Sequence, residues 1–251
     1  MEVSPAKRRR IDVEEAGDVA HFTCPITLAF PVDPVIAEDG HTYDRSAITR
    51  WISMKQSSPM TGLPMQDRLV ASAQIKSWTR ILVQRGVGRP DQRQAVEKCL
   101  QDEELVSKVR SQAEAGSASA MRQMGFTYQR GKYGVSQNYS TARHWFERAA
   151  YKNDVQGMAL YGSYLLEGKG GPVDSLHGIL FTSIAAHKVD LAAYELGWLW
   201  TLGTHGVTKD EELGRYWLRL ATSGKLEYNN LAEHSRVRTE KFLLDLTASS
   251  P

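Results

Sequence analysis

Four short motifs between residues 22 and 61 decide the fold of the N-terminal part of this chain. In order, they are Phe22-Thr23-Cys24-Pro25-Ile26-Thr27, Asp33-Pro34-Val35, Gly40-His41-Thr42-Tyr43-Asp44-Arg45-Ser46-Ala47-Ile48-Thr49-Arg50-Trp51 and Ser58-Pro59-Met60-Thr61. Their Gly, Pro, Asp and Ser residues are typical of turns, and an apolar helix is expected after the last motif. Four motifs in a fixed order make a more specific signature than any one of them alone.

The cysteine content excludes one common way of stabilising a small, turn-rich domain. Cys24 and Cys99 are the only cysteines, and neither stands in the paired Cys or Cys/His spacing of a zinc site. A zinc-bound domain is therefore excluded. No secretory signal is seen in the first twenty residues, which favours a reducing compartment and argues against a disulfide.

The four motifs resemble those of the U-box, the metal-free relative of the RING domain found in ubiquitin ligases. The resemblance implies an α+β fold over residues 21–85 that needs no cofactor, and a surface that docks a ubiquitin-charged conjugating enzyme. Its first loop, central helix and second loop would contribute Ile26, Trp51 and Pro59. Structural roles stay open for all three residues. Ile26 and Trp51 could pack into the core, and Pro59 could serve as a turn former without contacting a partner.

The resemblance also implies that polar side chains brace the two loops in place of zinc. Asp44, Arg45 and His41 are the expected braces, and further candidates are Asp39, Ser57, Ser58, Thr61 and Asp67. A partly exposed pair contributes about 1 kcal/mol, so several must act together.

Two positions depart from the U-box pattern. Gly62 stands where many active members have an Arg that reaches the conjugating enzyme and ubiquitin together, and Ser72 stands where an Asn is usual. Docking is therefore expected to be intact, whereas activation of the conjugating enzyme is open, or could depend on another cation such as Arg68.

From Ser117 onward the sequence repeats with a period near 36 residues, which indicates a helical solenoid. Recurring pairs are Met124-Gly125, Tyr161-Gly162 and Leu196-Gly197, and then Ala149-Ala150, Ala185-Ala186 and Ala221-Thr222. The units resemble Sel-one-like repeats of the tetratricopeptide class, which implies an all-α repeat domain over residues 117–247. We expect units at 117–154, 155–190 and 191–226, a C-terminal helix, and two short capping helices within 92–116. The aromatic residues of the repeats are expected in the core more than in a binding groove.

The tail and the overall charge limit the partners. Residues 1–20 are expected to be a disordered basic tail, in which Lys7, Arg8, Arg9 and Arg10 form either a nuclear import signal or a solvated run. The net charge is only +2 and no basic patch on a folded surface is visible, so nucleic acid is not expected as a partner. Polar residues such as Lys188 and Asp190 interrupt the apolar stretch 181–202, so no membrane is expected either. An intracellular soluble protein of the nucleus or cytoplasm is expected.

Together, the two resemblances imply a ubiquitin-protein ligase that promotes ubiquitin transfer to a substrate lysine. No catalytic residue is expected, because a U-box has no nucleophile and Cys24 lacks an electropositive setting. The repeats would bind a protein substrate or a chaperone, and homodimerisation is an open alternative. The rival interpretations are a non-catalytic scaffold and a co-chaperone adaptor, although the adaptor would need a Lys, Arg and Asn cluster that is not obvious in the sequence.

Overall fold

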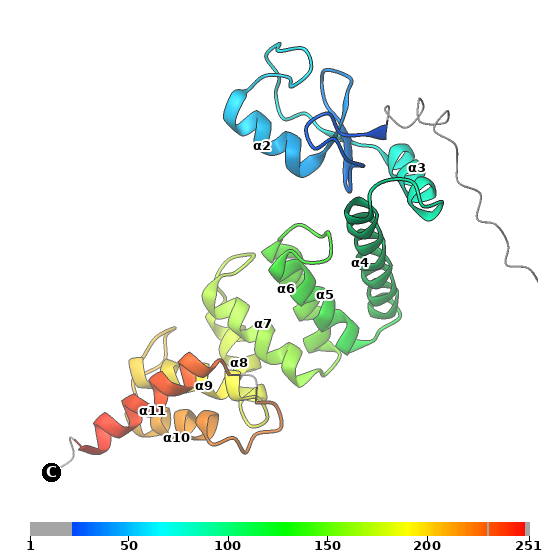
Figure 1. Cartoon of the computed structure of the whole chain (residues 1–251). Helices are drawn as coiled ribbons and strands as arrows, with labels where there is room; N and C mark the ends of the chain where they lie inside the picture. The colour runs from blue at the N-terminus through cyan, green and yellow to red at the C-terminus, as the bar shows by residue number, and fades with distance from the viewer. Residues whose placement is uncertain (1–21, 230, 249–251) are drawn as a thin grey trace, which may run out of the picture. The chain divides into compact units, whose positions relative to one another are not determined.

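The chain folds into two compact units, Met1–Asp102 and Glu103–Pro251, in a computed structural model that describes residues 22–229 and 231–248 (Figure 1). The predicted disordered tail and the import signal at Lys7 to Arg10 lie outside the described residues. Within these ranges, no helix combines the length and the apolar character needed to cross a membrane.

A small antiparallel sheet and two helices form most of the N-terminal unit. The elements are β1 (Pro34–Ile36), β2 (Thr42–Asp44), α2 (Arg45–Lys55), β3 (Val70–Ala71) and α3 (Ala73–Gln84). β1 is central, with Val35 opposite Tyr43 of β2 and opposite Ala71 of β3. The α+β fold expected for this part of the chain is confirmed.

The core of this unit lies between the sheet and α2. Ile48 and Ile52 are four residues apart and therefore share the buried face of α2. They pack with the completely buried Val35, Tyr43 and Cys24. The thiol of Cys24 is free and has no exposed surface, which agrees with a structural role for this residue.

A single helix, α4 (Pro90–Glu114), runs where the sequence favours two short helices in the 92–116 segment. That expectation is wrong because the polar run between the two apolar groups contains neither Gly nor Pro, so nothing ends the helix. Val96 packs with Phe30 and Val83, whereas Val109 packs with residues of the first repeat. Thirteen residues separate Val96 from Val109, a rotation of about 220°, so the apolar side of the helix changes face.

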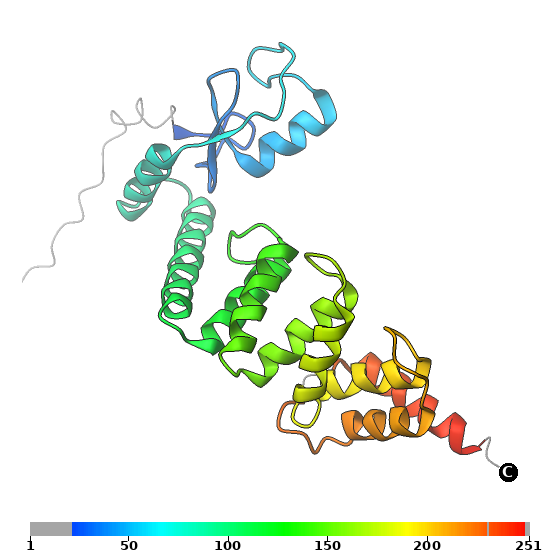
Figure 2. The same ribbon diagram turned by 180° about the vertical axis from the view of Figure 1, so that it is seen from behind.

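Three helix pairs and a final helix follow, and the all-α repeat fold is confirmed (Figure 2). In chain order they are α5 (Ala118–Arg130) with α6 (Tyr139–Tyr151), α7 (Val155–Glu167) with α8 (Ser175–Ala185), α9 (Asp190–Leu202) with α10 (Glu211–Thr222), and α11 (Glu233–Ala248).

The ends of the helices repeat as regularly as their cores. The first helix of each pair ends at a glycine with positive φ, namely Gly131, Gly168 and Gly203. The second helix begins after an N-cap whose side chain accepts a backbone N–H, and these caps are Asn138, Asp174 and Asp210. The caps lie 36 residues apart, so the sequence period sets the start of each second helix.

Glycines allow the two helices of each pair to approach closely. A Cβ added to Gly125 would lie 2.3 Å from Phe146, one on Gly162 would lie 2.9 Å from the Thr182 backbone nitrogen, and one on Gly197 would lie 2.7 Å from Leu218. Because the closely approached side chains and backbone are buried, they have little space into which to move.

We predict that Gly162→Ala destabilises the repeat domain. The gain in helix propensity is about 1 kcal/mol, but overpacking against the α8 backbone costs about 1–3 kcal/mol or more. Urea unfolding followed by circular dichroism should therefore show a net loss of up to about 2 kcal/mol or more. The exposed helix position Gln123→Ala is the control, and equal stability of both variants would contradict the close crossing.

Candidate functional site

The first loop of the N-terminal unit is a tight turn closed on itself. Cys24 N–H donates to the Ala29 carbonyl at 2.8 Å, and Leu28 N–H donates to the Cys24 carbonyl at 2.8 Å. Ile26 is half-buried and packs against the core cluster, whereas Leu28 is 76% exposed. The loop therefore carries one anchored and one exposed aliphatic side chain.

Trp51 connects α2 to the second loop. Its ring is half-buried against the same cluster that Ile26 contacts, and its Nε1–H donates to the Ser57 carbonyl at 2.9 Å. The Lys55 Nζ lies 4.2 Å from the ring centroid, over one face of the indole. Trp51 is therefore held in place by the second loop, with part of its surface exposed.

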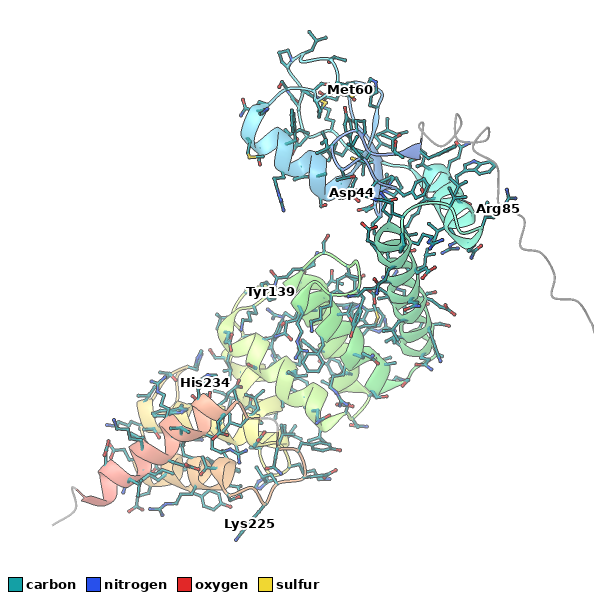
Figure 3. The ribbon with its side chains drawn as sticks, in the orientation of Figure 1. Asp44, Met60, Arg85, Tyr139, Lys225 and His234 are labelled. Atoms are coloured by element: carbon teal, nitrogen blue, oxygen red, sulfur yellow. The ribbon has the colours of Figure 1, made fainter. Side chains whose placement is uncertain are left out.

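The second loop, residues 57–64, closes on Ser58. Ser58 N–H donates to the Leu63 carbonyl at 2.8 Å, while its Oγ accepts the backbone N–H groups of Met60 and Thr61 at 3.1 and 2.9 Å. Pro59, at the start of this turn, is half-buried. Figure 3 labels Met60 on this loop and Asp44 at the start of α2.

Asp39 is the centre of the polar network that holds the second loop. Its Oδ2 accepts the Ser58 hydroxyl at 2.5 Å and the Tyr43 hydroxyl at 2.7 Å, and its Oδ1 accepts the His41 backbone N–H at 3.0 Å. The His41 Nδ1 lies 3.0 Å from the Asp39 carbonyl oxygen. One carboxylate thus joins the loop to β2 and to the turn before it.

Burial acts to raise the pKa of Asp39, because water is removed from the charged form. The hydrogen bonds from Ser58, Tyr43 and the His41 N–H, with the nearby His41 ring, outweigh this effect and hold the pKa below its usual value. Asp39 is accordingly ionised at neutral pH.

Asp44 and Arg45 bind a different segment, the one that follows the first loop. Asp44 caps α2 by accepting the Ser46 N–H at 3.1 Å, and it also accepts the Val32 N–H at 2.9 Å. The Arg45 Nε donates to Asp33 at 2.7 Å. The structure therefore brings His41 together with Asp39, but it places Asp44 and Arg45 in a separate polar group.

The loops also expose apolar side chains that were not among the predicted contacts. Leu63 of the second loop is 66% exposed and Met60 is 52% exposed, and Met54 on α2 is 68% exposed. The signal for Leu28, Met60 and Leu63 is their place in turns, where large apolar residues have no core to enter. These residues surround the half-buried candidates with further apolar surface.

Gly62 has a structural reason to be glycine. Its φ is +71°, a left-handed conformation that other residues adopt at a cost, and open space surrounds the position of an added Cβ. The nearest candidate for a substitute cation, Arg68, places its Nε 3.6 Å from Glu38. The second loop is therefore shaped for glycine, and Arg68, with 80% of its side chain exposed, makes only a surface ion pair.

The chemistry of this site is that of a binding surface formed by the two loops and α2. In the described part of the chain, no group of three or more His, Cys, Asp or Glu side chains could hold a metal ion. The thiol of the site, Cys24, is fully buried. The two loops and α2 present a small apolar surface, which the polar network around Asp39 supports.

Comparison with known proteins agrees with both parts of the chain. The family model for the U-box domain matches residues 20–80, and the model for the Sel1 repeat matches residues 118–154, 155–188 and 190–225. A Sel1 repeat protein from Oxalobacter formigenes, known from its crystal structure, is 27% identical, with a TM-score of 0.43, over 47% of this chain and 89% of that one.

Two curated relatives match over a short part of this chain. WD repeat, SAM and U-box domain-containing protein 1 of Danio rerio is 53% identical over 55 residues, which is 22% of this chain and 11% of that protein. U-box domain-containing protein 52 of Arabidopsis thaliana is 40% identical over 63 residues, which is 25% of this chain and 8% of that protein. The chain thus carries a U-box domain at residues 20–80, followed by three Sel1 repeats between residues 118 and 225.

Proposed function

We propose that this protein is a ubiquitin ligase whose U-box docks a ubiquitin-charged conjugating enzyme, while the Sel1 repeats bind a protein substrate or partner. The observation that carries the proposal is the apolar surface of the two loops and α2, in a domain whose relatives are U-box proteins. Ile26, Trp51 and Pro59 are the proposed contacts.

Ubiquitin transfer in this proposal requires no nucleophile from the chain. The substrate lysine amine attacks the thioester carbonyl, an isopeptide bond forms, and the thiol of the conjugating enzyme leaves as the carbon–sulfur bond breaks. A covalent ubiquitin intermediate on Cys24 is disfavoured because its side chain is inaccessible. The U-box would act by positioning the conjugate, which lowers the entropic part of the barrier.

One observation favours a second candidate, a scaffold that docks a conjugating enzyme without stimulating it. Gly62 provides no side chain, and Arg68 is paired with Glu38. A docked conjugate would then have no cation from the second loop to hold ubiquitin in a reactive orientation. The two candidates share the docking surface and differ in the rate of transfer.

We predict that Ile26→Ala abolishes most ubiquitin transfer. Truncating an apolar side chain at the centre of a small docking surface removes about 1–2 kcal/mol of binding, or a roughly 5- to 30-fold loss. An assay of purified chain with a panel of charged conjugating enzymes measures the effect. The control is Val70→Ala, which truncates an exposed aliphatic residue on β3. Transfer unaffected by Ile26→Ala would rule out docking through this loop.

We predict that Gly62→Arg increases ubiquitin discharge several-fold. The reason is the cation that the U-box resemblance expects at this position. The left-handed backbone costs about 1 kcal/mol of stability for any side chain, so Gly62→Ala is the matched control for strain. The rate of discharge to free lysine is the measurement. A wild type that binds the conjugating enzyme but gives no product, together with a stimulated Gly62→Arg variant, would favour the scaffold.

We predict that Asp39→Asn loosens the second loop and weakens docking along with stability. Hydrogen bonds to a buried charge contribute about 2 kcal/mol, and an amide cannot accept as strongly as a carboxylate. Because the folded pKa of Asp39 is lowered, its stabilisation is present above about pH 4, the ordinary pKa of a carboxyl, and is lost as the pH falls.

Thermal unfolding at pH 7 and pH 3 checks this prediction, with the exposed Asp67→Asn as the control. The difference between Asp39→Asn and wild type should shrink at the lower pH. A difference that is the same at both values would mean that the carboxylate charge does not support the loop.

A further inference from the structure

A cleft of about 450 Å³ opens in the C-terminal unit between α7, α9, the loop after α9, and α11. Its walls are largely apolar and include Leu166, Tyr194, Leu199 and Leu202. The size falls within the range of about 300–1,000 Å³ that is usual for ligand sites. Polar groups at this cleft therefore indicate what it could bind.

Two buried polar atoms of α9 at this cleft have no hydrogen-bond partner. They are Oε2 of Glu195 and Nε1 of Trp198, three residues apart and so on the same side of the helix. Leaving a buried polar group unpaired costs about 1–3 kcal/mol. Other unpartnered groups, such as Thr79 and Thr182, belong to residues that do not line this cleft.

A cation lies beside these two atoms. The guanidinium carbon of Arg238, on α11, lies 5.6 Å from the ring centroid of Trp198. Among the described residues, Arg238 has no carboxylate partner. The neighbouring acid Glu167, in contrast, is already paired with Lys169 and accepts the Ser163 hydroxyl. The available charge at the cleft is therefore positive.

Burial raises the pKa of Glu195 to about 8. The nearby Ser163 side chain opposes this rise, the charge of Glu167 adds to it, and Lys169 opposes it. At neutral pH the side chain is mostly a neutral acid, so its hydroxyl is a hydrogen-bond donor. It joins the indole N–H and the guanidinium as a third donor at the cleft.

We propose that this cleft binds a carboxylate of a peptide segment, held by Arg238 and the indole N–H of Trp198, with the apolar walls packing against neighbouring aliphatic side chains. The inference deepens the proposed function and rests on the part of it that gives the repeats a protein partner. A basic guest is disfavoured because it would meet the cation of Arg238, while Glu167 is already paired with Lys169.

A peptide is the favoured source of the carboxylate because α9 already packs against a peptide segment of this chain. The ring of Phe242 on α11 lies 4.9 Å from the ring of Trp198. The cleft lies along α9 between α7 and α11, so an extended segment could follow this surface. The apolar walls also exceed what a carboxylate group alone would cover.

The test uses the full chain and four fluorescent peptides built on Gly-Ser-Leu-X-Leu-Ser-Gly. Three have blocked ends and Glu, Gln or Lys at X, and the fourth has Gln at X and a free C-terminal carboxylate. Fluorescence anisotropy should show that a carboxylate peptide binds at least tenfold more tightly than the Gln and Lys peptides. The Glu and free-carboxylate peptides distinguish a side-chain source from a terminal one.

Substitutions assign the binding to this cleft. Trp198→Phe retains the ring and removes only the N–H, and Arg238→Gln removes the charge, so each should weaken carboxylate binding about 5- to 10-fold. Lys241→Gln, an exposed cation on the same helix, is the control and should have little effect. Tighter binding of the Lys peptide, no carboxylate peptide that binds more tightly than the blocked Gln peptide, or no binding of any peptide would each overturn the proposal.

The pH dependence separates Glu195 from the other titratable groups that face the cleft, which are Glu167, Lys169, Tyr194, His205 and Arg238. Carboxylate binding should weaken as the pH rises through about 8, because ionised Glu195 repels the guest. Glu195→Gln keeps a donor at every pH and should remove this loss. A loss that persists in Glu195→Gln would exclude Glu195 from the site.

These measurements need neither ubiquitin nor a conjugating enzyme. An inactive ligase that still binds the carboxylate peptide would contradict only the proposed function. An active ligase that binds none of the peptides would contradict only the carboxylate site.

Discussion

The hydrogen bonds of the Asp39 carboxylate hold the second loop of the U-box domain. A metal ion would fix the loops through several strong bonds, whereas here one buried charge accepts the Ser58 and Tyr43 hydroxyls and a backbone N–H. Ser58 in turn accepts two N–H groups of the second loop. Because these hydrogen bonds share one acceptor, the second loop is ordered as a unit. Most of its side chains are therefore not needed to hold its conformation.

The Sel1 repeats depend on a different constraint, which is the close approach of helices. Gly125, Gly162 and Gly197 bring the paired helices together, and edge-on aromatic contacts such as Phe146 with Tyr164, at 5.1 Å, fill the space between neighbouring pairs. Because these contacts are made by glycines and aromatic rings, few polar side chains are needed inside the stack of repeats. Buried polar groups that stay unpartnered beside the cleft, as at Glu195 and Trp198, therefore need an explanation.

The sequence was sufficient to predict both fold types, because each depends on local signals. Turn residues mark the loops of the U-box, and glycines and small residues recur with the period of the repeats. The α4 helix was missed because a change of apolar face resembles a break in periodicity when the helix partners are unknown. Helix N-caps such as Asp174 also recur with the 36-residue period, so they could have been used to predict where each second helix begins.

The candidate sites were less predictable, because they depend on contacts between distant segments. Asp39 was one of several candidate braces in the sequence. Its hydrogen bond with Ser58, which is 19 residues away along the chain, distinguishes it from Asp44, and this contact is visible only in the structure. The aromatic residues of the repeats were expected mainly in the core, which holds for Phe146, but Trp198 lines a cleft and Tyr216 is 54% exposed. Periodicity places a residue on a helix face, but it does not say which part of that face a later helix such as α11 covers.

The two surfaces suit different durations of contact. A conjugating enzyme must leave after each transfer, and a small apolar surface with few charges gives the weak, rapidly reversible binding that such an exchange needs. A substrate must stay while ubiquitin arrives, and it must be distinguished from other proteins. Unpartnered donors in a cleft favour such discrimination, because a guest that lacks a carboxylate leaves them unpaired and forfeits the charge-assisted bonds. Under the proposed function, apolar docking at the U-box and polar selection at the repeats would separate turnover from specificity within one chain.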